Sequence, residues 1–242
     1  MLTFKQYLIE AVKEGKNLHL EHLEDEVLNH GIDGTRAAIN FLQSLRDMLA
    51  GNAKKSVNVS VKWDGAPAIF AGINPENKKF FVGTKGVFNV NPKVNYTDAD
   101  IDKNHSAAGL NAKLKVALKH LPKLGITDVL QGDMLFTDDD FKTETIDDKS
   151  YITFTPNTIT YAIPKESSHK ITKAKMGIVW HTTYSGEKLE DMRASFGANI
   201  GGLTKTNDVW FSDANYQDTS GTVNFNKACL LYTSPSPRDR QK

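Results

Sequence analysis

Hydrophobic residues follow two different spacings along the chain, and the change between them divides it. In residues 1–52 they recur every three or four positions, as Leu42 and Leu45 do, and this spacing lines one face of a helix. Farther along, apolar and polar residues alternate, as in 57–61, which is typical of a half-buried strand. The pattern predicts a small helical extension over 1–52 and a β-rich body over 53–228.

Three helices are expected in the extension. The first follows Thr3, a residue type that caps helices well, and the second covers 18–28. A turn at 31–34 then leads to a third helix, which Thr35 caps and Gly51 ends.

The body contains short segments with the strand pattern and one amphipathic helix that Pro122 ends. The predicted strands cover 57–62, 68–73, 79–82, 126–130, 151–154, 158–163, 176–184, 209–211 and 222–225. Residues 89–105 are polar and are expected to form a loop, and 189–196 are expected to form a helix. These elements predict an α+β fold.

Composition sets limits on the kind of protein. With 242 residues, 39% hydrophobic and 24% charged, the chain is long enough to bury a substantial core. The net charge of +1 gives no overall basic signature, so any nucleic-acid surface is expected to be a local patch. Because no apolar run is long enough to span a bilayer and no signal-peptide pattern is present, we expect a cytoplasmic protein without a membrane partner.

Residues 229–242 share no periodicity with the preceding chain, and they contain the single cysteine, Cys229. The run resembles a translated sequencing adapter, so we expect a non-native tail and a body cut short near residue 228. A genuine Ser/Pro/Arg tail is the alternative. One cysteine also excludes a disulfide framework and a cysteine-based zinc site.

One short motif carries the clearest chemistry. The predicted strand 57–62 ends at Lys62, and Asp64-Gly65 follows as a tight turn. A lysine held by rigid backbone can serve as an amine nucleophile once it has lost its proton. Lys62-x-Asp64-Gly65 resembles the nucleotidyl-acceptor motif of the covalent nucleotidyltransferases, which include ATP-dependent DNA ligases, RNA ligases and capping enzymes. A surface hairpin in which Asp-Gly is only turn chemistry is the alternative.

Two further elements occur in the order that this family shows. Lys85-Gly86 follows a predicted strand, where phage RNA ligases place a basic residue on nucleotide phosphate. Gly132-Asp133 follows another strand and resembles the family's Gly-Glu-Leu element, with aspartate in place of glutamate. The resemblance covers roughly residues 57–184.

The resemblance implies a nucleotidyltransferase fold, similar to an ATP-grasp-type ligase, in which antiparallel sheets and flanking helices surround ATP and Mg²⁺. Lys62 would form a lysyl-AMP intermediate, and Asp64 would orient Lys62 or bind metal through water. Lys85 would stabilise phosphate charge, and Asp133 would hold the ribose or Mg²⁺.

Further residues follow from the same resemblance. Gly65 and Gly86 would allow the backbone to approach the nucleotide closely, and Tyr161 or Trp180 would stack on the purine. The sequence does not choose between these two aromatic residues, and it favours a structural role for His181 at the end of a strand.

The partner implied is the end of an RNA or DNA strand, which would be sealed or modified. Overall similarity to uncharacterised tailed-phage proteins would place this chain in the cytoplasm of an infected bacterium. One alternative is a phage structural or nucleic-acid-binding protein with a degenerate, non-catalytic form of the fold. Another is capping or protein AMPylation at the same lysine. The family's later Glu-Gly and Lys-x-Lys elements are not found, as expected for a shortened chain.

Two groups of metal-ligating residue types are expected to be solvated instead. His19 and His22 lie among acidic residues on a predicted helix, but the spacing fixes no third ligand. The acidic alternation in 98–102 lacks the glycine and terminal glutamate of a calcium loop.

Overall fold

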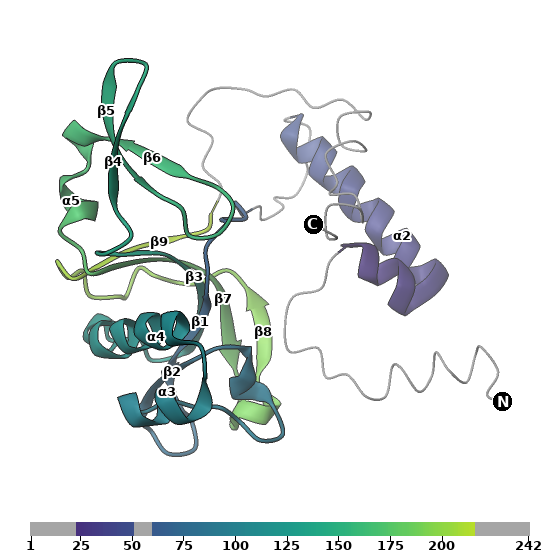
Figure 1. Cartoon of the computed structure of the whole chain (residues 1–242). Coiled ribbons are helices and arrows are strands. Elements are labelled where there is room, and N and C mark those ends of the chain that lie inside the picture. Colours follow the sequence, from purple (N-terminus) through teal and green to yellow (C-terminus); the bar gives the residue numbers. More distant parts are fainter. Residues whose placement is uncertain (1–22, 51–59, 216–242) are drawn as a thin grey trace. The chain divides into compact units, whose positions relative to one another are not determined.

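The computed structural model describes residues 23–50 and 60–215, which belong to two compact units (Figure 1). The first unit consists of residues 1–59 and 216–242, and the second consists of 60–215. The second unit contains both sheets and is the one in which the predicted site residues lie.

The described part of the first unit is the helix α2 (Leu23–Leu49), which bends at Gly31. Gly31 has φ 56° and ψ −127°, a backbone conformation that glycine adopts without steric penalty. The predicted turn at 31–34 is therefore a kink inside one helix. Thr35 does not cap a new helix, because its hydroxyl donates a hydrogen bond to the Gly31 carbonyl at 2.8 Å. The helix predicted after Thr3 lies outside the described residues.

The second unit is built on a six-stranded sheet in the order β2-β1-β3-β7-β8, with β9 also paired to β7. Its strands are β1 (Ala68–Ile73), β2 (Phe80–Gly83), β3 (Val129–Thr137), β7 (Met176–Ser185), β8 (Arg193–Phe196) and β9 (Val209–Asp213). A three-stranded sheet, in the order β4-β5-β6, consists of β4 (Lys142–Ile146), β5 (Lys149–Phe154) and β6 (Tyr161–Pro164). The α+β prediction is confirmed. The named strands pair antiparallel, as expected, with the exception of β7 and β9, which run parallel.

Helices and 3₁₀ turns connect these strands. They are α3 (Asp98–Asn104), α4 (Ala108–His120), α5 (His169–Thr172), η1 (Lys85–Phe88), η2 (Leu121–Leu124), η3 (Lys165–Ser167) and η4 (Leu189–Asp191).

One face of the large sheet packs against α4. Leu114 and Ala117 of α4 are fully buried, and they belong to one cluster with Ile69, Met134 and Ile178 of the sheet. Each aliphatic side chain buried in this way contributes about 1.5–3 kcal/mol of transfer free energy. This cluster fixes the large sheet to α4.

The opposite face of the large sheet carries aromatic residues. Phe70 and Tyr184 pack there, with ring centroids 5.5 Å apart. A second core cluster joins Phe136 and Val179 of this sheet to Phe154 of the three-stranded sheet. The two sheets are therefore held together by apolar packing.

The predicted strand 57–62 is wrong where the structure describes it. Ser60 forms only an isolated bridge with Asn215, and residues 61–65 have no regular secondary structure. Val61 is 41% exposed, so the alternation of valines does not mark a buried face there. Residues 57–59 lie outside the described part.

Two other predicted elements are wrong. The expected loop 89–105 includes α3, which Thr97 begins with a capping box: its hydroxyl accepts the Asp100 N–H, and the Asp100 carboxylate accepts the Thr97 N–H. The expected helix 189–196 is a 3₁₀ turn followed by β8, because β8 pairs with β7. Tertiary pairing overrides local helix propensity in this segment.

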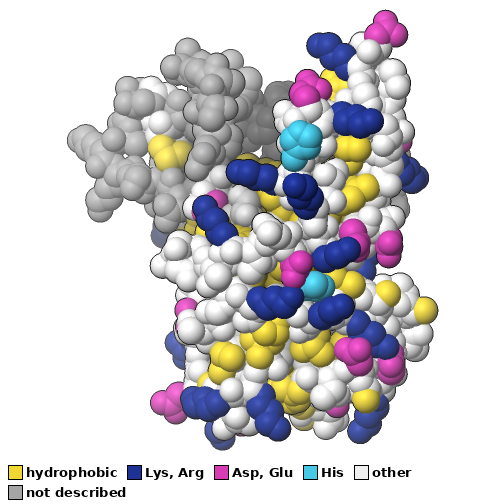
Figure 2. All heavy atoms as spheres, turned by 90° about the vertical axis from the view of Figure 1, so that its left-hand side faces the viewer, with side chains coloured by type: hydrophobic (Ala, Val, Ile, Leu, Met, Phe, Trp, Pro, Cys, Tyr) yellow, Lys and Arg dark blue, Asp and Glu magenta, His cyan; other side chains and the backbone are white. Residues whose placement is uncertain are grey.

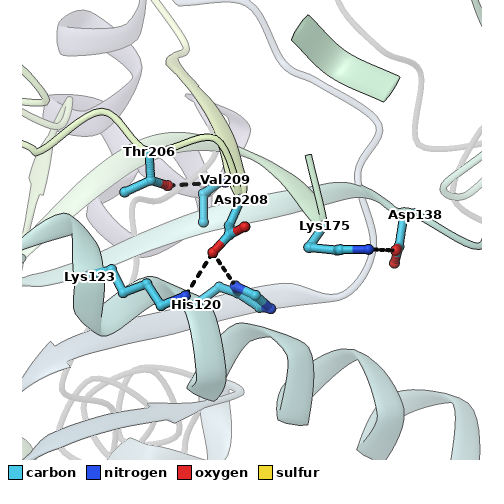
Figure 3. A network of polar contacts seen from close by, with 7 residues as sticks. All are labelled: His120, Lys123, Asp138, Lys175, Thr206, Asp208 and Val209. Carbon is cyan, nitrogen blue, oxygen red and sulfur yellow. Dashed lines mark hydrogen bonds and ion pairs between the residues drawn. The ribbon is translucent and has the colours of Figure 1, made fainter. Parts of the chain in front are cut away.

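A polar network ties the end of α4 to the start of β9 (Figure 3). Asp208 Oδ2 lies 2.7 Å from Lys123 Nζ and 3.3 Å from His120 Nδ1. Burial of His120 lowers its pKa, although Asp208 acts in the opposite direction. The hydrogen bond from Lys123 lowers the pKa of the Asp208 carboxyl. Burial thus favours the neutral form of His120, and the contacts of Asp208 anchor the end of α4 to β9.

The coloured surface in Figure 2 has basic and acidic side chains interspersed on one face, in agreement with the net charge of +1. None of the helices that the structure describes is long and apolar enough to cross a membrane.

Candidate functional site

Residues 62–67, here called the motif segment, are held in place by backbone hydrogen bonds at both ends. The Val61 N–H donates to the Ala214 carbonyl at 2.7 Å, directly after β9. At the other end the Ala66 N–H donates to the Met134 carbonyl at 2.9 Å, and the Met134 N–H donates to the Pro67 carbonyl at 3.1 Å. The segment, which leads into β1, is therefore hydrogen-bonded near the end of β9 on one side and to the middle of β3 on the other, and it does not form a strand.

Gly65 brings the motif segment directly onto Asp133. A Cβ atom added to Gly65 would lie 2.5 Å from the Asp133 Cβ and 2.9 Å from the Met134 carbonyl oxygen. Only glycine fits this close approach. The first and third sequence elements, Lys62-x-Asp64-Gly65 and Gly132-Asp133, thus meet in the fold.

The Asp64 carboxylate is bound by the turn between β5 and β6. It accepts hydrogen bonds from the Ile159 N–H at 2.7 Å, Asn157 Nδ2 at 2.9 Å and the Thr158 N–H at 2.7 Å. These donors favour the charged form and hold the pKa of Asp64 below its usual value, with a smaller contribution from Lys62. The Asp64 side chain thereby fixes the motif segment to the three-stranded sheet.

Tyr161 supports the same attachment. Its hydroxyl oxygen accepts the Asp64 N–H at 3.0 Å. Its ring stacks on Trp63 at a centroid distance of 5.6 Å and on Phe154 at 5.3 Å. Tyr161 therefore lies beside the motif segment, where it packs between two other aromatic rings.

Trp180 lies in a different environment. Its side chain is completely buried in the cluster under α4. A Cβ atom on Gly132 would lie 2.8 Å from Trp180 Cε3, so the glycine before Asp133 makes room for the indole. Of the two aromatic candidates, Tyr161 is the one that the structure brings to the motif segment.

Asp133 has a neighbour that the sequence did not predict for the site. His181 Nε2 lies 3.6 Å from Asp133 Oδ1, and His181 Nδ1 lies 2.8 Å from Thr182 Oγ1. In the register of β3 and β7, Gln131 is opposite Thr182 whereas Gly132 is opposite Trp180, so His181 is the extra residue of a β-bulge. A bulge redirects a side chain, and here it accompanies the contact between His181 and Asp133.

The sequence shows a family relationship. A family model described as a family of unknown function, DUF6267, matches residues 17–232. The chain belongs to this family. A search of the curated proteins gave no match, and neither did a search of the solved structures.

The two lysines that were predicted to act on phosphate are both exposed. Lys62 begins the motif segment, and Lys85 begins η1 after β2. Within the described ranges no hydrogen bond or ion pair joins Lys85 to Lys62 or to Asp133. Gly86 accepts the Lys93 N–H at 2.9 Å through its carbonyl, and the atoms nearest to a Cβ added at Gly86 belong to Lys93 and Thr84.

Lys113 is a second residue near the motif segment that the sequence did not indicate. From α4, its Nζ donates to the Ala66 carbonyl at 3.3 Å and lies 3.8 Å from Asp140 Oδ2. Its sequence position gave no signal, since α4 contains two other lysines, Lys115 and Lys119, and no local pattern distinguishes Lys113 from them. The arrangement of the site is a fixed backbone segment, a carboxylate with a histidine neighbour, and an exposed amine.

Proposed function

We propose that this protein is a covalent nucleotidyltransferase of the polynucleotide-ligase type, with Lys62 as the nucleophile. The observation that carries the proposal is the contact of Gly65 with Asp133. That contact joins two sequence elements that lie far apart in the chain and that resemble parts of one nucleotide site in the family. Chance matches to two short motifs would not be expected to meet in the fold.

In the proposed first step the neutral Lys62 amine attacks the α-phosphorus of ATP. A nitrogen–phosphorus bond forms, the bond from the α-phosphorus to the bridging oxygen breaks, and pyrophosphate leaves with that electron pair. The amine proton passes to solvent or to a nearby base. Hydrogen bonds on both sides of Lys62 restrict its backbone, and such positioning lowers the barrier of a phosphoryl-type transfer.

Asp133 is the residue that would hold Mg²⁺ or the ribose. Mg²⁺ uses one or two protein carboxylates together with substrate phosphates and water, so a single half-buried carboxylate fits that requirement. When bound, Mg²⁺ would neutralise charge on the phosphates. Lys85 would add a second positive charge there if the nucleotide extends toward η1.

In the proposed later steps the adenylate passes to a 5′-phosphate of RNA or DNA. The nitrogen–phosphorus bond breaks, and Lys62 recovers its proton. A 3′-hydroxyl then attacks the activated 5′-phosphate and AMP leaves. Capping or AMPylation would share the first step and differ only in the acceptor.

Covalent labelling tests the first step directly. The protein is incubated with Mg²⁺ and α-labelled ATP or GTP, and it is then separated on a denaturing gel. We expect retained label on the wild type, and label at background for Lys62→Ala and Lys62→Arg. Lys205→Ala removes an exposed lysine outside the motif segment, and it should label as the wild type does. Absence of label with both nucleotides, from a folded protein, would refute nucleotidyl transfer.

One observation favours a second candidate, a phage protein that binds a nucleotide or nucleic acid without turnover. The Asp64 carboxylate is engaged by three hydrogen-bond donors of the 157–159 turn, which is a structural role. This candidate predicts saturable ATP binding by equilibrium dialysis with no label on the gel.

A further inference from the structure

A cavity of about 390 Å³ lies at the end of β1 that is remote from the motif segment. Asn74, which lines the cavity, follows the last residue of β1, whereas Ala68 at the first residue pairs with Asp133. A strand of this length separates its ends by roughly 17 Å. The cavity is therefore a different place from the contact between Gly65 and Asp133, and its volume lies in the range of small-ligand sites.

Tyr96 lines this cavity and has a hydroxyl proton to donate. Its oxygen accepts hydrogen bonds from Asn74 Nδ2 at 2.7 Å and from Asn77 Nδ2 at 2.8 Å. The orientation of both amides is fixed, because their Oδ1 atoms accept the N–H groups of Glu76 and Lys79. Both lone pairs of the Tyr96 oxygen are thus used, and its proton remains for an acceptor. Within the described residues no such acceptor is present.

The cavity is lined by charges of both signs. Lys188 and Glu76 both line it, and neither has an ion-pair partner in the part of the chain that the structure describes. Glu190 also lines the cavity and adds negative charge. A ligand with one anionic and one cationic group would complement such a wall better than a ligand with a single charge.

Apolar side chains form the rest of the wall. Val87 and Leu189 are buried, with exposed fractions of 0% and 4%, whereas Val90 is 97% exposed although it lines the same cavity. An apolar group that entered the cavity would cover Val90 and remove apolar surface from water.

We propose that this cavity binds a small zwitterion with an apolar side chain, of the chemical class of a free apolar amino acid. The ligand carboxylate is held by the Lys188 amine and the Tyr96 hydroxyl, and the ligand ammonium group is held by Glu76. The ligand side chain covers Val90, the exposed apolar residue of the wall. The proposal does not depend on nucleotidyl transfer at Lys62.

Calorimetric titration of the full chain, without ATP, tests the ligand class. L-leucine and L-phenylalanine are compared with N-acetyl-L-leucine, which lacks the ammonium group, and with L-leucinamide, which lacks the carboxylate. We expect saturable binding of a free amino acid with a Kd in the millimolar range or tighter, and binding at least about tenfold weaker for both blocked forms. No saturable binding of either amino acid, or equal binding of the blocked forms, would overturn the proposal.

Variants locate the binding in this cavity. Lys188→Gln, Glu76→Gln and Tyr96→Phe should each weaken L-leucine binding, by about tenfold for the charged residues and less for Tyr96→Phe. Glu187 is the sequence neighbour of Lys188, but Glu187 does not line the cavity. The Glu187→Gln variant is therefore the control, and it should bind L-leucine as the wild type does. Circular dichroism of each variant checks the fold. Unchanged binding in the folded Lys188→Gln and Glu76→Gln variants would contradict the assignment, whatever the labelling of Lys62 shows.

Discussion

Asp64 and Asp133 meet at Gly65, one as its neighbour in sequence and the other as its neighbour in space, and their surroundings differ. Asp64 accepts three hydrogen bonds from the 157–159 turn, and these lower its pKa. Asp133 accepts no hydrogen bond among the described residues, and its ion-pair neighbour is His181 at 3.6 Å. One carboxylate is used by the fold, and the other is available to a ligand.

This difference separates two roles that a short motif can suggest for one acidic residue, a role in the fold and a role in ligand binding. The acidic residue that lies two positions from Lys62 fixes the backbone on which the lysine is carried. The carboxylate that has no hydrogen bond in the described part of the chain comes from β3, far along the chain, and it lies against the motif segment at Gly65. The following three variants test that division of roles.

The largest effect is expected from Gly65→Ala, because the added methyl group would lie 2.5 Å from the Asp133 Cβ. Such overpacking costs about 1–3 kcal/mol of unfolding free energy, and it would also push the motif segment away from Asp133. Chemical denaturation measures the loss. Gly109→Ala is the matched control, because nothing lies within 4 Å of its added Cβ, and it should be neutral or slightly stabilising in α4. Equal stability of the two variants would disprove the close contact.

An intermediate effect is expected from Asp64→Asn. The amide presents a donor where the turn offers only donors, so the melting temperature at pH 7 should fall, though less than in Gly65→Ala. Because the folded pKa of Asp64 is lowered from 3.8, its charge stabilises the fold above the unfolded pKa. That contribution is lost as the pH falls through the lowered folded pKa.

Melting curves of the wild type and of Asp64→Asn between about pH 5 and pH 2 measure this loss. The wild type should lose more stability than the variant over that range. Parallel curves would show that the carboxylate and the 157–159 turn are not linked in the folded protein.

The smallest effect on stability is expected from Asp133→Asn. The substitution removes a charge that has no hydrogen bond in the described part of the chain, so the unfolding free energy should change by no more than about 0.5 kcal/mol. ATP binding or labelling should fall strongly in the same variant. A large loss of stability would mean that Asp133 serves the fold, as Asp64 does.

Local sequence patterns predicted the elements whose hydrophobic spacing alone determines their structure. The apolar stripe of α4 and the buried run of β7 both appear close to their predicted bounds, since each packs one face onto a core. The β-rich nature of the second unit was predictable for the same reason. The capping box of Thr97 and Asp100 was also readable, but the polar composition of 89–105 concealed it.

Long-range contacts decided what the sequence did not reveal. In the sequence Val61 continues the alternating strand pattern, but in the structure its N–H donates to the carbonyl of Ala214, far along the chain. Asn157 lies 93 residues from Asp64, the carboxylate that it binds. The bulge at His181 depends on the register with β3, and no local signal encodes a register. The sequence contains the three motif elements, but the arrangement of their residues in space depends on pairing between strands that are distant in the chain.

The bridge between Ser60 and Asn215 has a topological consequence. These residues are the first and last of the second unit, so the chain enters and leaves that unit at one point. The unit is in effect a closed loop of polypeptide inserted into the sequence of the other. Taken alone, such a unit would be suited to circular permutation, because its two ends already touch and could be joined while new termini are opened in an exposed connection.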